Sequence, residues 1–324
     1  MPKAIRYDQP GGPEVMKWVD VEAGKPKAGE VRVKHHAVGL NYIDVYFRNG
    51  LYPQPLPGGL GQEGAGEVAE VGEGVTSLKV GDRVAYTGVP PGSYAEERVL
   101  PAEKIVKLPD AIGYDDAASI MLQGLTVQYL LRRTYPVKAG DTILIHAAAG
   151  GVGLLACQWA KALGATVIGT VGSDEKAELA KAHGCDHAIV YTRENFTERV
   201  KDITNGAGVP VVYDSIGKDT YLGSLDCLAP LGLFVSFGNA SGPLPPIDSK
   251  EFASRGSLFF TRPTLFTYIA KRPDLERGAA ELFDVVSSGK VKTNVRQRYQ
   301  LADVADAHRD LEARRTTGST ILLP

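Results

Sequence analysis

The stretch Ala147-Ala148-Ala149-Gly150-Gly151-Val152-Gly153 decides the fold of this chain of 324 residues. It follows an apolar run at residues 142–147 and opens a helical stripe, after which Gly164 stands where a C-terminal glycine cap is expected. The stripe consists of Val152, Leu154, Leu155, Trp159 and Leu163. A second apolar run follows at residues 166–171. We therefore predict a strand, a glycine turn, a helix and a second strand.

A unit of this kind suits a dinucleotide. A pyrophosphate needs backbone N–H groups within reach and a helix N-terminus whose partial positive charge faces the anion. Residues 149–153 offer both between two strands, and that context makes a weak glycine pattern specific. A glycine-rich turn without a ligand is the alternative. We predict that the turn binds the pyrophosphate of a dinucleotide.

The chain around this unit continues the same rhythm. Six apolar runs alternate with helical segments, at residues 142–147, 166–171, 187–191, 209–214, 232–238 and 257–261. This alternation predicts an α/β fold whose doubly wound parallel sheet has six strands, which is the Rossmann arrangement.

The flanking regions differ from this central part. Up to about residue 110 the chain is β-rich, with strand-like runs at residues 30–34, 64–72 and 80–84 between glycine and proline turns. After Pro263, a mostly helical segment leads to further strands at residues 295–299 and 319–323. We expect a cofactor-binding domain at residues 124–263 and a β-rich catalytic domain that joins residues 1–123 to 264–324.

The composition narrows the functional classes. Hydrophobic residues make up 44% of the chain and charged residues 23%, which is typical of a globular protein. With a formal net charge of −2, the protein has no overall positive potential that would favour binding to nucleic acid or to an anionic membrane. Residues 1–7 lack an apolar signal core, and no stretch approaches a membrane-spanning length. We expect a cytoplasmic protein without a nucleic-acid or membrane partner.

The three cysteines argue against a metal centre. Cys157, Cys185 and Cys227 are isolated from one another in the sequence and lack the close spacing of zinc sites and disulfide frameworks. We interpret them as small buried apolar side chains and expect no metal.

The end of the second predicted strand indicates which dinucleotide binds. NAD sites commonly place an acidic residue there, on the ribose 2′-hydroxyl. Here the strand ends at Gly172-Ser173, with Lys176 soon after and Tyr191 closing the third strand. These groups could surround a 2′-phosphate, which favours NADPH. In the alternative, Lys176 is a solvated helix residue and Asp174 or Glu175 reaches the ribose.

Several motifs in order resemble the medium-chain dehydrogenase/reductase superfamily, and within it the zinc-free quinone oxidoreductases similar to ζ-crystallin. The resemblance spans essentially the whole chain. It rests on the segments at residues 39–44 (GLNYID), 61–66 (GQEGAG), 80–84 (VGDRV), 123–126 (QGLT), 148–153 (AAGGVG) and 214–217 (DSIG). It implies a β-rich domain of the GroES-like type beside the Rossmann domain.

The departures from the zinc alcohol dehydrogenases of that superfamily are informative. Those enzymes have a cysteine where Asn41 stands and a histidine where Gln62 stands, and they carry a four-cysteine zinc lobe that this chain lacks. Amides are poor zinc ligands. Glu63 is common to both patterns, and we interpret it as a structural hydrogen-bonding residue.

The resemblance also implies site residues. Asn41, Tyr46 and Tyr52 are the expected catalytic groups, and Tyr46, Tyr52 and Gln62 are expected to contact the substrate. The expected cofactor contacts are Asn41, Thr126, Gly150, Gly151, Val152, Gly172, Ser173, Lys176, Tyr191, Ser215, Phe237, Gly238, Asn239, Phe260, Thr261 and Ser319. As an alternative, either tyrosine is a core or rim residue of the aromatic stretch at residues 42–47.

The resemblance implies a homodimer formed by the cofactor domains, with Ser257-Leu258-Phe259-Phe260 as its edge. The expected function is reduction of a quinone by NADPH without zinc. One alternative is reduction of the activated double bond of an alkenal or enone by NADPH. A second is a crystallin-like or RNA-binding role without turnover, which the acidic charge balance disfavours.

Overall fold

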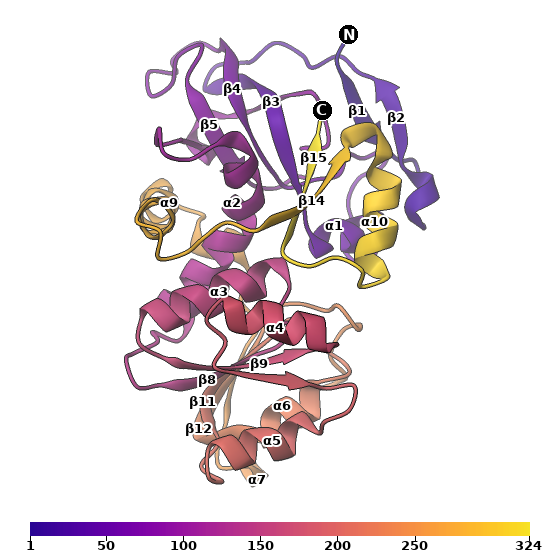
Figure 1. The fold of residues 1–324 in the computed structure, drawn as a ribbon. Helices are drawn as coiled ribbons and strands as arrows, with labels where there is room; N and C mark the ends of the chain where they lie inside the picture. Colours follow the sequence, from indigo (N-terminus) through magenta and orange to yellow (C-terminus); the bar gives the residue numbers. More distant parts are fainter. The chain divides into compact units, whose positions relative to one another are not determined.

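The computed structural model describes residues 1–324, which form two compact units (Figure 1). The first unit comprises Met1–Leu125, Tyr268–Ser287 and Thr293–Pro324, and the second comprises Thr126–Thr267 and Ser288–Lys292. The chain passes from the first unit into the second within helix α2 (Tyr114–Tyr129), which also contains the domain boundary expected from the sequence at residue 123. No helix is long and apolar enough to cross a bilayer.

The first unit is built around a mixed sheet of seven strands, in which the last two strands of the chain pair parallel with each other and the other pairings are antiparallel. Its strands are β3 (Glu30–Leu40), β4 (Glu63–Val71), β5 (Arg83–Thr87), β6 (Glu97–Pro101), β7 (Ile105–Lys107), β14 (Val295–Gln300) and β15 (Ser319–Leu323), beside the separate pair β1 (Lys3–Arg6) and β2 (Lys17–Asp20). The sheet order is β14-β15-β3-β4-β5-β7, and β6 also pairs with β3. Because β15 pairs antiparallel with β3, the C-terminal strand belongs to the same sheet as the N-terminal ones.

Helices and two apolar clusters complete the first unit. The helices are η1 (Pro13–Val15), α1 (Tyr42–Arg48), η2 (Ala102–Lys104), α9 (Arg272–Ser287), η4 (Leu301–Asp303) and α10 (Val304–Glu312). One cluster gathers Tyr7, Leu40 and Tyr94 with Val304 of α10, and the other gathers Val33, Val68 and Tyr86 within the sheet. The first cluster fixes the end of β3, from which the chain enters α1.

The second unit confirms the predicted Rossmann arrangement. Its strands are β8 (Thr142–Ile145), β9 (Thr166–Val171), β10 (His187–Val190), β11 (Val209–Asp214), β12 (Leu228–Ser236) and β13 (Phe259–Thr261). All pairings are parallel, in the order β10-β9-β8-β11-β12-β13. Numbered along the chain this is 3-2-1-4-5-6, so the order reverses beside β8, where doubly wound sheets bind their ligands.

Helices cover both faces of this parallel sheet (Figure 1). They are α3 (Gly151–Ala162) and α4 (Asp174–Ala182) on one face, and α5 (Phe196–Ile203), α6 (Tyr221–Asp226) and α7 (Ser249–Ser254) on the other. The π-helix η3 (Leu130–Thr134) and the short α8 (Leu265–Tyr268) complete the list. Gly164 follows α3 with φ +87°, which confirms the predicted glycine cap.

Candidate active site

The glycine turn of the second unit joins β8 to α3 and permits close backbone approach. Ala147 adopts a left-handed φ of 53°, and Gly150 N donates to Ala147 O at 2.9 Å. A Cβ on Gly153 would lie 2.2 Å from Ala147 O, so glycine is required for the helix to pack on the strand end. Gly150 is the N-cap residue and no side chain caps α3. Gly150, Gly151 and Val152 therefore form an uncapped helix N-terminus, which is the geometry that an anionic pyrophosphate requires.

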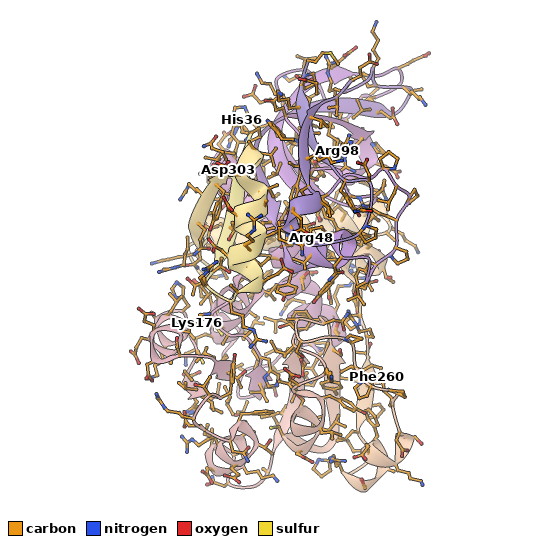
Figure 2. The ribbon with its side chains drawn as sticks, turned by 90° about the vertical axis from the view of Figure 1, so that its right-hand side faces the viewer. His36, Arg48, Arg98, Lys176, Phe260 and Asp303 are labelled. Atoms are coloured by element: carbon orange, nitrogen blue, oxygen red, sulfur yellow. The ribbon has the colours of Figure 1, made fainter.

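The four residues expected around a 2′-phosphate lie where β9 and β10 end. A Cβ on Gly172 would lie 3.0 Å from the hydroxyl of Tyr191, so the ring of Tyr191 packs against the glycine. Ser173 is the N-cap of α4, and its Oγ accepts the backbone N–H of Lys176 at 3.3 Å. Figure 2 labels Lys176 at this helix start. The structure thus brings Gly172, Ser173, Lys176 and Tyr191 together.

The carboxylate of Asp174, the alternative ribose ligand, forms an ion pair with Arg193. Arg193 Nη1 donates to Asp174 Oδ2 at 2.5 Å, and Nη2 donates to Oδ1. Hydrogen bonding to the Arg193 guanidinium holds the pKa of Asp174 below its usual range. Arg193 could not be predicted from the sequence, because its partner lies 19 residues away and no local pattern joins the two.

The expected contacts after β11 and β12 form one cluster at the carboxyl edge of the sheet. Phe237 N donates to Asp214 O at 2.8 Å, and Asn239 lies in the loop that follows. A Cβ on Gly238 would lie 2.4 Å from Ser215 O, so the two backbones touch. Ser215, Phe237, Gly238 and Asn239 are therefore gathered beside one another.

Phe260 and Thr261 lie on the edge strand β13. Thr261 pairs with Val235 at the carboxyl end of the sheet. The ring of Phe260 instead stacks on Phe234, with centroids 5.8 Å apart, and contacts Phe252 of α7. Packing between the sheet and α7 therefore occupies this ring, and its predicted cofactor contact stays a prediction.

A buried polar network lies behind the glycine turn. Ser224 Oγ donates to Asp214 Oδ2 at 2.8 Å, so it must accept from His146 Nε2 at 2.9 Å. His146 Nδ1 then accepts from Thr170 Oγ1 at 2.8 Å. Burial lowers the pKa of His146, although Asp214 opposes the shift. His146 therefore joins the ends of three strands as a neutral hydrogen-bonding residue.

In the first unit, Asn41 occupies the junction between β3 and α1. It is the N-cap residue of α1, and its backbone N–H donates to Asp44 Oδ2 at 2.9 Å. Its side-chain Nδ2 donates to Glu63 Oε1 at 2.5 Å, and its Oδ1 accepts from Gln123 Nε2 at 3.1 Å. The amide of Asn41 is therefore buried and held at both ends.

Glu63, the first residue of β4, is held as firmly as Asn41. Its Oε2 accepts the backbone N–H of Leu122 at 2.7 Å. A Cβ on Gly39 would lie 2.2 Å from Glu63 Oε1, which explains the glycine at that position. Burial raises the pKa of Glu63 to about 8, while the hydrogen bonds from Leu122 and Asn41 act in the opposite direction.

The two candidate catalytic tyrosines lie in contact. Tyr46 is buried on α1, and Tyr52 is partly exposed in the loop that follows. Their rings meet edge to face with centroids 5.2 Å apart, and Tyr52 N donates to Tyr46 O at 2.9 Å. Tyr42 and Phe47 extend the cluster. The partial exposure of Tyr52 makes it the better candidate for contact with a small ligand.

The side-chain amide of Gln62 lacks a hydrogen-bond partner within the protein. It is 0% exposed, and neither its amide nitrogen nor its amide oxygen forms a hydrogen bond within the protein. A buried polar group without a partner costs about 1–3 kcal/mol. A ligand that bonds this amide would remove the cost, and the substrate contact expected of Gln62 stays a prediction.

A second buried chain of polar groups holds the start of α1. Tyr94 Oη donates to Asp44 Oδ2 at 2.9 Å and lies 3.2 Å from His308 Nε2. His308 Nδ1 accepts from the buried Arg48, labelled in Figure 2, at 2.9 Å. Burial raises the pKa of Asp44 to about 7 and lowers that of His308 to about 3. This chain fixes the backbone around Asn41.

Two expected cofactor contacts stay predictions. Thr126 is buried on α2 in the second unit. Ser319, in the first unit, donates from Oγ to Gln123 Oε1 at 2.7 Å. No group of three or more His, Cys, Asp or Glu side chains is arranged to hold a metal ion.

Comparison with known proteins identifies the family. Residues 27–110 match the alcohol dehydrogenase GroES-like domain, and residues 151–284 match the zinc-binding dehydrogenase domain. A quinone oxidoreductase of Pseudomonas aeruginosa is 55% identical over 100% of both chains. A 2-haloacrylate reductase of a Burkholderia species is 48% identical over 97% of this chain and 96% of that protein.

A solved structure agrees with these sequence matches. The crystal structure of Escherichia coli quinone oxidoreductase complexed with NADPH has a TM-score of 0.98 at 48% identity, and the match covers 99% of this chain and 100% of that one. Both units thus have counterparts in one enzyme. The chain belongs to the quinone oxidoreductase family of the medium-chain dehydrogenase/reductase superfamily.

Proposed function

We propose that this protein is an NADPH-dependent quinone oxidoreductase, which converts a quinone, NADPH and a proton into a hydroquinone and NADP⁺. The observation that carries the proposal is the pair of buried amides, Asn41 and Gln62, at the positions where the zinc dehydrogenases of the superfamily have metal ligands. A quinone is already a strong electrophile, so hydrogen-bond donors and orientation suffice for its reduction. Relatives named quinone oxidoreductase support the assignment.

The second unit has the features that an NADPH site needs. The uncapped N-terminus of α3 would hold the pyrophosphate at Gly150, Gly151 and Val152. Ser173, Lys176 and Tyr191 would surround the 2′-phosphate. When bound, NADPH supplies the hydride. Because Arg193 already pairs with Asp174, the alternative in which that carboxylate binds an NAD ribose is disfavoured.

The first unit provides donors for a quinone oxygen. An amide nitrogen carries two N–H groups, so Asn41 has one beyond that given to Glu63. The unpartnered Gln62 amide and the hydroxyl of Tyr52 or Tyr46 supply further donors. A tyrosine with an ordinary pKa near 10 stays protonated at neutral pH and can donate to developing negative charge. Water supplies the one proton that completes the hydroquinone.

Variants of these donors test the assignment. Asn41→Ala and Tyr52→Phe should each lower kcat/KM for 1,4-benzoquinone about tenfold to a hundredfold, the value of a hydrogen bond to a charged group. The Kd of NADPH should stay unchanged in Tyr52→Phe, whereas a higher Kd of NADPH in Asn41→Ala would support the cofactor contact expected of Asn41. Tyr42→Phe, on the same helix and outside the proposed donor set, is the matched control. Wild-type quinone rates in both Asn41→Ala and Tyr52→Phe would remove these residues from the mechanism.

A second candidate function is reduction of an activated carbon-carbon double bond. The relative named 2-haloacrylate reductase favours it, because it is 48% identical to this chain, as is a quinone oxidoreductase of Escherichia coli. An enone oxygen would accept the same donors. The ratio of kcat/KM for a quinone to that for a 2-alkenal distinguishes the two reactions.

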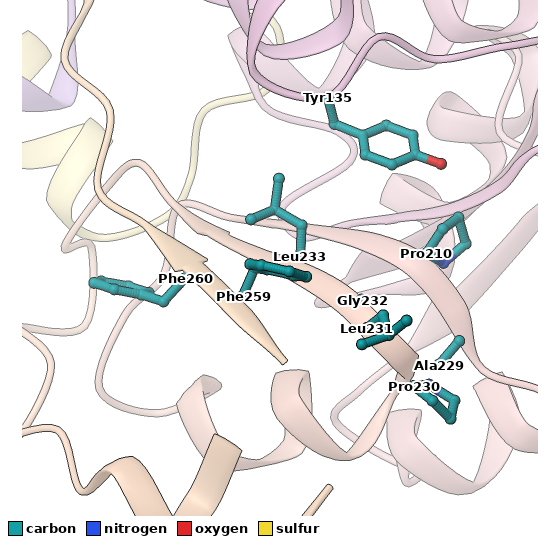
Figure 3. A pocket seen from close by; sticks show the side chains of 9 residues that line it. All are labelled: Tyr135, Pro210, Ala229, Pro230, Leu231, Gly232, Leu233, Phe259 and Phe260. Carbon is teal, nitrogen blue, oxygen red and sulfur yellow. The ribbon is translucent and has the colours of Figure 1, made fainter. Parts of the chain in front are cut away.

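We also propose that the protein forms a homodimer through the edge of the second unit's sheet. Phe259 of β13 is 59% exposed and Leu231 of β12 is 66% exposed. An apolar sheet edge of this kind is a hazard unless it is covered. Figure 3 shows the pocket of 580 Å³ beside it, lined by Tyr135, Pro210, Ala229, Pro230, Leu231, Gly232, Leu233, Phe259 and Phe260.

We propose that the protein is cytoplasmic and has no nucleic-acid partner; the formal net charge of −2 supports the absence of a nucleic-acid partner. Fractionation of the source cells tests the location. A filter-binding assay with single-stranded RNA at physiological salt tests the absence of a nucleic-acid partner, and saturable RNA binding would contradict it.

A further inference from the structure

The side-chain amide of Asn41 could adopt two orientations that differ by half a turn. They have nearly the same shape but exchange a donor for an acceptor at each end. In one orientation an N–H group can face a bound quinone oxygen. In the other a carbonyl oxygen takes its place and repels that quinone oxygen. The activity proposed for this protein therefore depends on what selects the orientation.

Two neighbours of Asn41 select it. Glu63 Oε1 lies 2.5 Å from Nδ2, and a carboxylate can only accept. Gln123 Nε2 lies 3.1 Å from Oδ1 and can only donate. Reversing Asn41 would place donor against donor at Gln123 and acceptor against acceptor at Glu63.

The donor and acceptor order continues beyond Asn41. Because Gln123 donates from Nε2, its Oε1 faces Ser319 and accepts the Oγ proton at 2.7 Å. Glu63 is the only member of this series without a donor when ionised, so it sets the direction of every bond that follows. The series runs from Glu63 through Asn41 and Gln123 to Ser319.

The carboxyl group of Glu63 has little freedom to turn away. Leu122 N donates to its second oxygen at 2.7 Å. The absence of a side chain at Gly39 makes room for the first oxygen, since a Cβ there would lie 2.2 Å from it. The residue is fully buried. The carboxylate of Asp44 has a different task, because it accepts the backbone N–H of Asn41.

We infer that Glu63 is a positioning residue, whose carboxyl group fixes the Asn41 amide with an N–H group available to the quinone oxygen, and that Gln123 holds the opposite end. This inference rests on the proposed function. Glu63 touches neither reactant in this scheme and acts through Asn41 alone.

Glu63→Gln is the most direct test. The new amide must place an NH₂ group against either Asn41 Nδ2 or Leu122 N, and Asn41 can escape a donor-donor contact by reversing. We expect kcat/KM for 1,4-benzoquinone to fall about tenfold to a hundredfold, as losses of orienting partners do. The Kd of 9,10-phenanthrenequinone without NADPH should rise. Glu67→Gln, an exposed residue of the same strand, is the matched control and should retain wild-type values.

A double-mutant cycle with Asn41→Ala tests whether Glu63 acts through Asn41. In the Asn41→Ala background, Glu63→Gln should change kcat/KM by less than about twofold, because the group that it orients is gone. An equal loss in both backgrounds would overturn the inference, and so would a wild-type rate for Glu63→Gln alone. A wild-type rate for Asn41→Ala alone would remove Asn41 from the proposed donors and overturn the inference, whereas a wild type that does not reduce quinones would contradict the proposed function.

The pH profile adds a readout that a purely structural role would not change. Both oxygens of Glu63 face N–H donors, so the ionised form fits these contacts while burial opposes it. The wild-type kcat/KM should rise with pH as Glu63 ionises, and Glu63→Gln should remove that rise. Asp44 and Tyr94 are the neighbouring titratable groups, and both remain in the variant. An unchanged rise in Glu63→Gln would contradict the inference.

Gln123→Met provides a second variant if Glu63→Gln does not fold. Methionine has a similar volume but cannot donate to Asn41 Oδ1, and Glu63 stays in place. We expect a loss of kcat/KM that disappears in the Asn41→Ala background. A loss that persists there would overturn the role of Gln123 as a holder of the amide.

Discussion

Arg193 forms a two-pronged ion pair with Asp174, the first residue of α4. The pair lies at the end of the second strand, where NAD-binding proteins commonly present a carboxylate to the ribose. Asp174 is the alternative ribose ligand predicted from the sequence, whereas nothing in the sequence indicates that Arg193 lies at this site. Cofactor preference can therefore be tested by substitutions around this pair.

Lys176→Ala should raise the Kd of NADPH about tenfold, through loss of a charge-assisted contact to the 2′-phosphate, and should leave that of NADH unchanged. Fluorescence titration with both nucleotides measures this. Lys181→Ala, on the same helix, removes a lysine that pairs with Glu178 and serves as the control. Equal weakening of both nucleotides would show that Lys176 does not contact the 2′-phosphate.

Asp174→Ala separates the two interpretations of the ribose site. If Arg193 occupies the carboxylate, the variant should bind NADPH at least as tightly as the wild type, because the guanidinium becomes available. Isothermal titration with each nucleotide gives the answer. A weaker affinity for NADH in Asp174→Ala would support the interpretation in which Asp174 binds the ribose.

Gly153→Ala should destabilise the second unit and abolish NADPH binding. The added methyl group would lie 2.2 Å from Ala147 O and 2.7 Å from the backbone of Ala148, so α3 must move away from β8. Overpacking of this kind costs about 1–3 kcal/mol in the free energy of unfolding. Gly113→Ala, where the nearest atom is 3.6 Å away, is the control. Urea unfolding and nucleotide titration measure both effects, and wild-type affinity in Gly153→Ala would refute the assigned turn geometry.

The two buried carboxyl groups should make stability fall as pH rises. Burial raises the pKa of Asp44 to about 7 and that of Glu63 to about 8, whereas both are near 4 in an unfolded chain. Between about pH 4.5 and about pH 8 the native state therefore binds more protons than the unfolded state. The free energy of unfolding then decreases with pH, by at most about 1.4 kcal/mol per pH unit for each group.

Urea unfolding of the wild type and Glu63→Gln across this range measures the effect. Burial lowers the pKa values of His35 and His308, which adds an opposite slope at lower pH. The comparison with Glu63→Gln cancels that contribution. We expect a flatter pH dependence in the variant, and identical slopes would show that Glu63 does not titrate as described.

Leu231→Glu should convert the proposed dimer into a monomer, because it places a charge in the apolar sheet edge. Leu222→Glu changes an exposed leucine on α6 and should leave the dimer intact. Sedimentation velocity measures both. A monomeric wild type, or a dimer that persists in Leu231→Glu, would contradict the proposed interface.

Local signals in the sequence predicted the second unit well. The Ala147 to Gly153 turn and the six apolar runs correspond to β8–β13, since buried parallel strands are continuous apolar segments. The start of β12 at Leu228 was missed, because Pro230 and the left-handed Leu231 interrupt the run before Gly232. The run at residues 80–84 is mainly a turn: Gly81 has φ +85°, Val80 is 63% exposed, and β5 begins only at Arg83.

The contacts of the candidate site depend on pairings that local patterns do not encode. Asn41 and Glu63 are 22 residues apart and meet because β3 pairs with β4. Gln123 approaches Asn41 from 82 residues away. The sequence identified Asn41 and Gln62 through a family resemblance, whereas the unpartnered state of Gln62 became visible only in the folded chain.

The most direct test of the central claim is a steady-state comparison of NADPH with NADH against 1,4-benzoquinone, 9,10-phenanthrenequinone and a 2-alkenal. We predict the highest kcat/KM for NADPH with a quinone, and a lower value with NADH for every acceptor. A higher kcat/KM for the 2-alkenal, or a preference for NADH, would contradict the assignment as an NADPH-dependent quinone oxidoreductase.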